Sequence, residues 1–360
     1  MTRQAGDEGF EGERQGGALA MTLANRPDPV AHDAQGPPAP RADDPAAGSR
    51  AVLAHHGKSF NWAGRFLSRG ALDRAARLYA FCRYLDDLAD EHDDVAQAER
   101  NLRAVREDLA RGRSTRPDVA DFFDLCDGAP SAIAGAILLA DTLIGDLTPM
   151  RIDSVRALQV YSLGVAGCVG IMMCPVLDVA EPERAMPFAI DLGIAMQMTN
   201  IARDVLEDAG KSRIYLPPDW TGGPLDPDDL VRDKGDARAR AWGGVVRLLQ
   251  MADAHYASAR AGLCFLPFQA RAAIHVASRV YRGIGTVVLA GGPERYWLGR
   301  AYTSSARKVM LTAGALGGLG FLPGRGGAVH DPRLHGDIAP TLRAYGFDPQ
   351  ADGIVFSGPR

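Results

Sequence analysis

The stretch Tyr79-Ala-Phe-Cys-Arg-Tyr-Leu-Asp-Asp-Leu-Ala-Asp-Glu91 decides how the rest of the chain is interpreted. Asp86 and Asp90 are four residues apart, so on a helix they lie on the same face. Tyr79 and Arg83 fall on that face as well, while the opposite side is apolar. The spacing therefore predicts a helix that buries one side and presents a phenol, a guanidinium and two carboxylates on the other.

A second stretch, Gln197-Met-Thr-Asn-Ile-Ala-Arg-Asp-Val-Leu-Glu-Asp208, repeats this pattern. One helical stripe contains Gln197, Asn200, Asp204 and Asp208, and the remaining positions are mostly apolar. Like charges at this spacing destabilise an isolated helix by a few tenths of a kcal/mol, and burying carboxylates without partners costs much more. Two such stripes in largely apolar helices therefore indicate that cations bind there.

Hard divalent cations with oxygen ligands suit these stripes. Mg²⁺ in particular often binds one or two carboxylates together with substrate phosphates. Arg83 and Arg203, each close to one acidic motif, would add fixed positive charge for phosphate oxygens. A solvated helix face with surface ion pairs would explain a single Asp-x-x-x-Asp pattern equally well, but two copies with flanking arginines favour a site for metal and diphosphate.

These stretches resemble the two aspartate-rich motifs of the squalene/phytoene synthases, which join two prenyl diphosphates head to head. Leu85-Asp-Asp-Leu-Ala-Asp90 is similar to the first motif. Asn200-Ile-Ala-Arg-Asp-Val-Leu-Glu-Asp208, followed by Gly210-Lys-Ser-Arg-Ile-Tyr-Leu-Pro217, is similar to the second motif and its downstream loop. The resemblance extends from about Ala51 to about Leu316 and is greatest to bacterial phytoene synthases.

The resemblance implies an all-α, isoprenoid-synthase-type helical bundle around a deep apolar cavity. Hydrophobic periodicity independently favours an all-α domain, because helical patterns recur from residue 51 onward and strand-like alternation is absent. We expect a disordered leader over residues 1–50, a catalytic domain over 51–316, and a Gly-rich, weakly structured tail over 317–360. The uncharged segment 157–177 is long enough to span a membrane, but its glycines and polar residues favour a buried helix that lines the cavity.

The resemblance also implies roles for individual residues. The metal ligands would be Asp86, Asp90, Asn200, Asp204 and Asp208, with Mg²⁺ as the cofactor and Mn²⁺ as its alternative. The four aspartates would be catalytic through these ions, which neutralise the charge of a leaving diphosphate. Tyr79 and Tyr281 would be catalytic because aromatic faces stabilise carbocations, although either could instead be a core aromatic with its hydroxyl bonded.

Substrate binding would draw on several parts of the chain. The residues assigned to it are His56, Gly57, Lys58, Ser59, Tyr79, Arg83, Gln197, Arg203, Lys211, Arg213, Tyr281 and Arg300. The segment His56-Gly-Lys-Ser59 resembles the N-terminal diphosphate-binding segment of the family, with glycine where some relatives have serine. Lys211 and Arg213 lie in a long polar loop, 209–236, which we interpret as a lid; a merely solvated basic loop is the alternative.

The implied reaction condenses two geranylgeranyl diphosphates through a cyclopropyl (prephytoene) diphosphate to phytoene, in carotenoid biosynthesis. Three features favour phytoene over squalene: no C-terminal membrane anchor is recognised, no NADPH site is evident, and the run Val169-Gly-Ile-Met-Met-Cys-Pro-Val176 resembles bacterial phytoene synthases. Two alternatives stay open. One is a dehydrosqualene- or squalene-type synthase that uses farnesyl diphosphate, and the other is a non-catalytic scaffold of the same fold.

Composition limits the cellular context. The chain has 360 residues and a net charge of −4, which gives no reason to expect nucleic-acid binding. Its five cysteines are odd in number and lack Cys-x-x-Cys spacing, which argues against a disulfide framework or a zinc site and suits a reducing compartment. We expect a cytoplasmic protein, peripheral at the membrane, that transiently contacts a membrane surface or a downstream desaturase.

Overall fold

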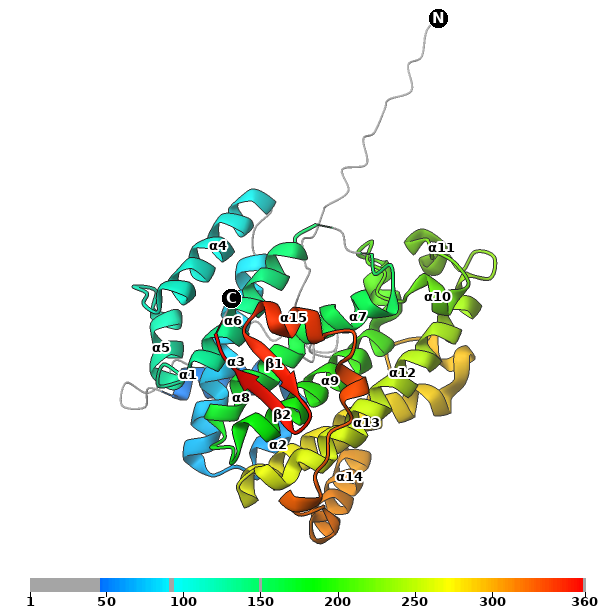
Figure 1. Cartoon of the computed structure of the whole chain (residues 1–360). Coiled ribbons are helices and arrows are strands. Elements are labelled where there is room, and N and C mark those ends of the chain that lie inside the picture. The colour runs from blue at the N-terminus through cyan, green and yellow to red at the C-terminus, as the bar shows by residue number, and fades with distance from the viewer. Residues whose placement is uncertain (1–45, 91–93, 149–150, 359–360) are drawn as a thin grey trace, which may run out of the picture.

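The computed structural model describes residues 46–90, 94–148 and 151–358 (Figure 1). Most of the expected leader, residues 1–45, lies outside these ranges, and helix α1 already begins at Ala47. The helices before the tail are, in chain order, α1 (Ala47–His56), α2 (Lys58–Gly64), α3 (Arg69–Asp90), α4 (Val95–Arg111), α5 (Pro117–Leu125), α6 (Pro130–Gly145), α7 (Val155–Ser162), η1 (Leu163–Gly167), α8 (Cys168–Val176), α9 (Pro182–Ala209), α10 (Pro218–Thr221), α11 (Pro227–Val231), α12 (Ala237–Gly262), η2 (Leu263–Phe265), α13 (Phe268–Tyr296) and α14 (Ser305–Gly317). The prediction of an all-α bundle is therefore confirmed for this part of the chain.

Helix α9 forms the centre of the bundle. It packs most extensively on α12 and also contacts α8, η1 and α13. Most of its residues are buried, polar as well as apolar ones, which is typical of a helix surrounded by other helices rather than one with a solvent-facing side. The second acidic stripe therefore belongs to the core of the protein and not to its surface.

The segment from Val155 to Val176 is one continuous helix made of α7, the π-helical turn η1 and α8. It is the helix of the described residues that is long and apolar enough to cross a membrane, yet 72% of its most apolar window is buried inside the protein. Leu163, the first residue of η1, is fully buried. Glycines let this helix approach α9: a Cβ atom on Gly193 would lie 2.1 Å from the carbonyl oxygen of Ala166.

The expectation of a weakly structured tail over 317–360 is wrong. After η3 (Leu319–Phe321), η4 (Arg325–Gly327) and η5 (Pro332–His335), the chain forms α15 (Ala339–Ala344) and an antiparallel hairpin of β1 (Phe347–Gln350) and β2 (Gly353–Phe356). Strand β2 lies on α9 (Figure 1). Four tail side chains are almost completely buried, namely Ile338, Leu342, Phe347 and Ile354. These isolated apolar positions anchor the tail without producing a recognisable period.

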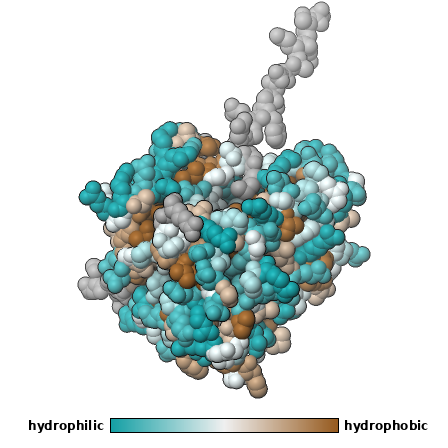
Figure 2. Space-filling view, viewed as in Figure 1, coloured by the Kyte–Doolittle hydropathy of each residue, from teal (hydrophilic) through white to brown (hydrophobic). Residues whose placement is uncertain are grey.

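On the face shown in Figure 2, hydrophobic side chains are scattered among hydrophilic ones. All five cysteines are buried free thiols, as the absence of paired spacing predicted.

We predict that Gly193→Ala lowers the free energy of unfolding by about 1–3 kcal/mol, because the new methyl group has no room against the backbone of η1. The matched control is Gly145→Ala at the end of α6, where an added Cβ meets nothing within 4 Å and the change should stay within about 0.5 kcal/mol. Chemical denaturation of both variants measures this difference, and equal stabilities would contradict the packing of α9 against η1.

Candidate active site

An apolar cavity runs through the bundle and encloses about 1370 Å³, its open mouth included. Residues from α2, α3, α8, α9 and α13 line it. Along α9 the lining extends from Asn200 back to Ala185, a span of 15 residues or about 22 Å of helix. Nearly all lining side chains are apolar, and Tyr79, Asn200 and Tyr281 are the main polar exceptions. One residue of each acidic stretch, Tyr79 from the first and Asn200 from the second, therefore lines the same apolar cavity.

Three aromatic rings stand together in the cavity wall. Phe60 lies 5.2 Å from Tyr281 and 6.4 Å from Tyr79, measured between ring centroids. The hydroxyl of Tyr79 is buried and has no hydrogen-bond partner among the described residues. Burial raises the pKa of Tyr281 to about 12 and that of Tyr79 further. Both phenols therefore stay neutral, and their faces and hydroxyls are available to a guest in the cavity.

Asp204, in the second motif, is fully buried and surrounded by guanidinium groups. Arg203 Nε donates to both of its oxygens at 2.8 and 3.0 Å, and Arg300 Nη2 donates to Oδ2 at 2.9 Å. Arg300 follows α13, whose last turn is redirected at Gly292, a glycine with a positive φ of 67°. Two of the four arginines assigned to substrate binding thus meet on one carboxylate near the end of the central helix.

Asp208 is buried without compensation. Only 2% of the residue is exposed, and neither carboxylate oxygen has a hydrogen-bond partner among the described residues. Burial, with a further contribution from the charge of Asp204, holds the pKa of Asp208 well above its usual range. Gln197 is buried in the same stripe, and its Oε1 is also without a partner in that part of the chain. These oxygens are therefore available as ligands of a cation.

The first motif lies on α3, and its two adjacent carboxylates also differ in environment. Asp86 is buried, at 2% exposure, whereas Asp87 forms an ion pair with Arg83 at the helix surface. The side chain of Asp90 lies outside the described part of the structure. Arg83 therefore pairs with Asp87, inside the motif, while Asp86 is buried.

The segment His56-Gly-Lys-Ser59 spans the break between α1 and α2. An added Cβ on Gly57 would lie 3.4 Å from the Tyr79 ring, so this break lies directly beside the first motif. Ser59 is buried, and burial together with the charge of Arg83 lowers the pKa of His56. The side chain of Lys58 lies outside the described residues. The structure thus places this segment beside Tyr79.

The two basic residues of the loop after α9 occupy different environments. Lys211 is partly exposed and pairs with Glu207 at 3.1 Å. Arg213 is buried, where it pairs with Asp146 at 3.3 Å and donates to the Tyr215 hydroxyl at 3.1 Å. Arg213 therefore ties the start of the loop to the end of α6. Asp146 and Tyr215 carried no recognisable signal in the sequence, because their role depends on this tertiary contact.

The residues present fit a divalent cation. Asp208 offers two unpartnered, buried carboxylate oxygens, and Asp204 and Asn200 lie one and two turns before it on α9. Asp86 supplies a second buried carboxylate from α3. An all-oxygen donor set of this kind is what Mg²⁺ prefers, and a bound ion would remove the cost of the uncompensated charge at Asp208.

We predict that Asp208→Asn stabilises the metal-free protein at neutral pH while abolishing Mg²⁺-dependent turnover. Because the pKa of Asp208 is raised in the folded state, the unfolded chain ionises first, and wild-type stability falls as the pH rises above about 4. The variant lacks this loss, so its melting temperature should exceed that of wild type by more at pH 8 than at pH 5.

Thermal unfolding in EDTA at both pH values measures this difference. The control is Asp118→Asn, an exposed carboxylate on α5, which should follow wild type. A variant less stable than wild type at both pH values would contradict the interpretation of Asp208 as an uncompensated carboxylate.

We predict that Arg213→Ala lowers the free energy of unfolding by about 3 kcal/mol, because it removes the guanidinium that pairs with the buried carboxylate of Asp146. Lys211→Ala removes the neighbouring basic side chain of the same loop, and its partly exposed pair should contribute no more than about 1 kcal/mol. Equal losses in denaturant titrations would mean that Arg213 does not anchor the loop.

Comparisons with known proteins agree with this geometry. The family model of the squalene/phytoene synthases matches residues 53–307. A phytoene synthase from Cereibacter sphaeroides is 38% identical over 268 residues, covering 70% of this chain and 74% of the relative. A 15-cis-phytoene synthase from Paracoccus sp. is 34% identical over 273 residues, covering 73% and 88%. Among solved structures, a dehydrosqualene synthase in complex with ligand superposes with a TM-score of 0.66 at 26% identity, covering 77% of this chain and 96% of that chain. The chain belongs to the squalene/phytoene synthase family.

Proposed function

We propose that the protein is a phytoene synthase: a prenyltransferase that joins two geranylgeranyl diphosphates head to head and releases diphosphate. The observation that carries this proposal is the similarity to several bacterial phytoene synthases over about 70% of the chain. The apolar cavity with carboxylates on both motif helices supports the same chemistry. A dehydrosqualene-type synthase that takes farnesyl diphosphate is the second candidate, because a solved dehydrosqualene synthase has the same fold.

We propose that diphosphate groups bind at the mouth of the cavity between the two motifs. Asp86 and Asp90 on α3 and Asn200, Asp204 and Asp208 on α9 would hold Mg²⁺. When bound, these ions would neutralise the charge on the departing diphosphate. Arg203 and Arg300 hold Asp204 in place and carry positive charge at the same end of α9, so they would contact phosphate oxygens. Lys211 and the segment His56-Gly-Lys-Ser59 would complete this contact.

The prenyl chains would lie in the apolar cavity, where water is excluded and cations survive. Tyr79, Tyr281 and Phe60 present their rings to this space, and neutral aromatic faces attract carbocations. The Tyr79 hydroxyl, which has no hydrogen-bond partner among the described residues, would orient the group that accepts the proton. In this scheme the proton is lost without reduction, so phytoene formation would need no NADPH.

We further propose that the enzyme works in the cytoplasm and touches a membrane or a desaturase only to pass on its product. The apolar product requires such a partner, because it does not dissolve in water. Exposed apolar residues on α14 and just beyond it, among them Val309, Met310 and Phe321, are suited to this contact. The net charge of −4 gives no support for nucleic acid as a partner.

The direct test is incubation with Mg²⁺ and either geranylgeranyl or farnesyl diphosphate, with and without NADPH, followed by mass analysis of the hydrocarbon. We expect C40 phytoene from geranylgeranyl diphosphate without NADPH, and no product from Asp86→Asn, since that variant removes the buried carboxylate of the first motif. Asp118→Asn is the exposed control and should keep full activity.

A C30 product from farnesyl diphosphate alone would favour the dehydrosqualene-type candidate. No product from either substrate, with the helical circular-dichroism signal intact, would favour a scaffold of the same fold.

We predict that Ala185→Phe shortens the cavity at the end remote from Asn200. A shorter cavity hinders binding of the longer geranylgeranyl chain more than that of the farnesyl chain. C40 formation should therefore fall by more than tenfold, while farnesyl diphosphate is still converted to C30 hydrocarbon. Product ratios in a mixture of both substrates measure the shift. If Ala185→Phe reduces both products equally, this end of the cavity does not hold the prenyl chain.

A further inference from the structure

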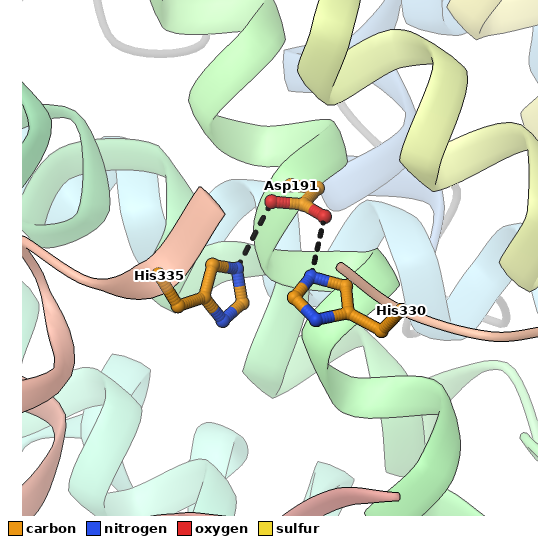
Figure 3. A group of neighbouring side chains, drawn as sticks. All are labelled: Asp191, His330 and His335. Carbon is orange, nitrogen blue, oxygen red and sulfur yellow. Dashed lines mark hydrogen bonds and ion pairs between the residues drawn. The ribbon is translucent and has the colours of Figure 1, made fainter. Parts of the chain in front are cut away.

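A third buried carboxylate on α9 lies outside the site described above. Asp191 is completely buried, and its two oxygens accept hydrogen bonds from four side chains, of which Figure 3 draws His330 and His335. Oδ1 contacts His255 Nδ1 at 2.7 Å and His335 Nε2 at 2.9 Å. Oδ2 contacts Ser258 Oγ at 2.5 Å and His330 Nε2 at 2.9 Å. Asp191 is not part of the cavity lining, although the next residue, Leu192, is, and it has no role in the proposed reaction.

The recorded partners of Asp191 include no fixed cation. In the described part of the chain, they are imidazoles and a hydroxyl, and none of them is an arginine or lysine. A buried carboxylate is normally paired with a cation or bound to a metal ion. Imidazole nitrogens are themselves common metal ligands, so the cluster is a candidate metal site.

The geometry of His330 and His335 indicates what this cation is. Both side chains come from the C-terminal tail and direct their Nε2 atoms at Asp191 from different sides (Figure 3). One ligand atom from each of the three residues lies within 4.8 Å of the others. Two ligands of one tetrahedral zinc ion are separated by about 3.3 Å, so small shifts would place an ion among them. Imidazole nitrogen with a carboxylate oxygen suits Zn²⁺ rather than Mg²⁺.

We propose that Asp191, His330 and His335 form a structural zinc site that fastens the C-terminal tail to helix α9. This site differs from a cysteine-based zinc site, against which the cysteine spacing argues. In the bound state the two Nε2 atoms act as ligands instead of hydrogen-bond donors to the carboxylate.

Residues of α12 support the same assignment. His255 and Ser258 approach Asp191 from a helix that does not belong to the ligand set. Carboxylates that bind zinc are commonly held by such hydrogen bonds, which fix their orientation. The His330 side chain keeps 9% of its surface exposed, which gives an ion a route into the cluster. The site therefore has its ligands, their support and access from solvent.

The site would connect the tail to the same helix that carries the second acidic motif. His330 and His335 flank η5 and precede α15 and the β hairpin. Asp191 lies about two and a half turns before Asn200 on α9. Zinc binding would thus add to the buried apolar contacts of the tail in holding β2 against α9.

The test uses the full-length protein, stripped with a zinc chelator and dialysed. Zn²⁺ affinity is measured by competition with a chromophoric chelator, and Co²⁺ is added separately to read ligand geometry from its visible absorption. We expect one tight Zn²⁺ per chain, a Co²⁺ band typical of four-coordinate nitrogen and oxygen ligation, and a higher melting temperature with Zn²⁺. The variants His330→Ala and His335→Ala should each lose about 100-fold or more in affinity, and Ser258→Ala about tenfold.

Two controls separate this site from others. His275→Ala removes a buried histidine elsewhere in the bundle, and Asp208→Asn removes a carboxylate of the proposed Mg²⁺ site; both should bind Zn²⁺ like wild type. Unchanged affinity in His330→Ala and His335→Ala would overturn the proposal. Absence of a tight Zn²⁺ ion and of a Co²⁺ band in wild type would do so even if the variants failed to fold, and a protonated histidine would then balance Asp191.

Discussion

The uncompensated burial of Asp208 is the constraint on which the organisation of the active site depends. A carboxylate with no hydrogen-bond partner in the described structure lies at the end of the longest buried helix before the loop, and such a group opposes folding by several kcal/mol. Its neighbour Asp204 is stabilised differently, by Arg203 and Arg300. Of this pair, Asp204 is hydrogen-bonded to arginines, whereas Asp208 would be stabilised by a bound cation. Such a combination is suited to binding a metal ion together with a diphosphate.

Helix α9 connects the carboxylate of Asp208 to the rest of the molecule. Its C-terminal half carries the acidic motif, its middle lines the cavity for about 22 Å, and its N-terminal half holds Asp191 and the tail. Close approach of η1 at Gly193 keeps this helix fixed against its neighbour. Packing remote from the proposed chemistry therefore fixes the helix that carries Asn200, Asp204 and Asp208.

Local patterns in the sequence predict the two acidic stripes and the helical bundle. The four-residue spacing of acidic side chains predicted the two stripes, and apolar periodicity predicted the bundle, because both properties belong to single helices. The partners of the arginines were not predictable in this way. Arg83 pairs with Asp87 and Arg213 with Asp146, and the second of these contacts depends on where a distant helix ends.

The tail and the histidine cluster were missed for the same reason. The tail shows no period, since its few buried side chains are spread among glycines and prolines and contact α9 only in the folded protein. Asp191 lies 139 residues before His330, and no spacing rule joins two segments so far apart. Phe60, next to the segment that the family resemblance identified, gains its role from the two tyrosine rings beside it.

The central claim is that both acidic motifs serve one metal-dependent site at the mouth of the cavity. The most direct measurement is a crystal structure with Mn²⁺ and an unreactive thiodiphosphate analogue of geranylgeranyl diphosphate, with Mn²⁺ located by its anomalous signal. The account predicts Mn²⁺ bound by Asp208 and Asp204 on α9 and by Asp86 on α3, with the prenyl chain along the apolar wall toward Ala185. Metal bound elsewhere, or a chain outside this cavity, would contradict it.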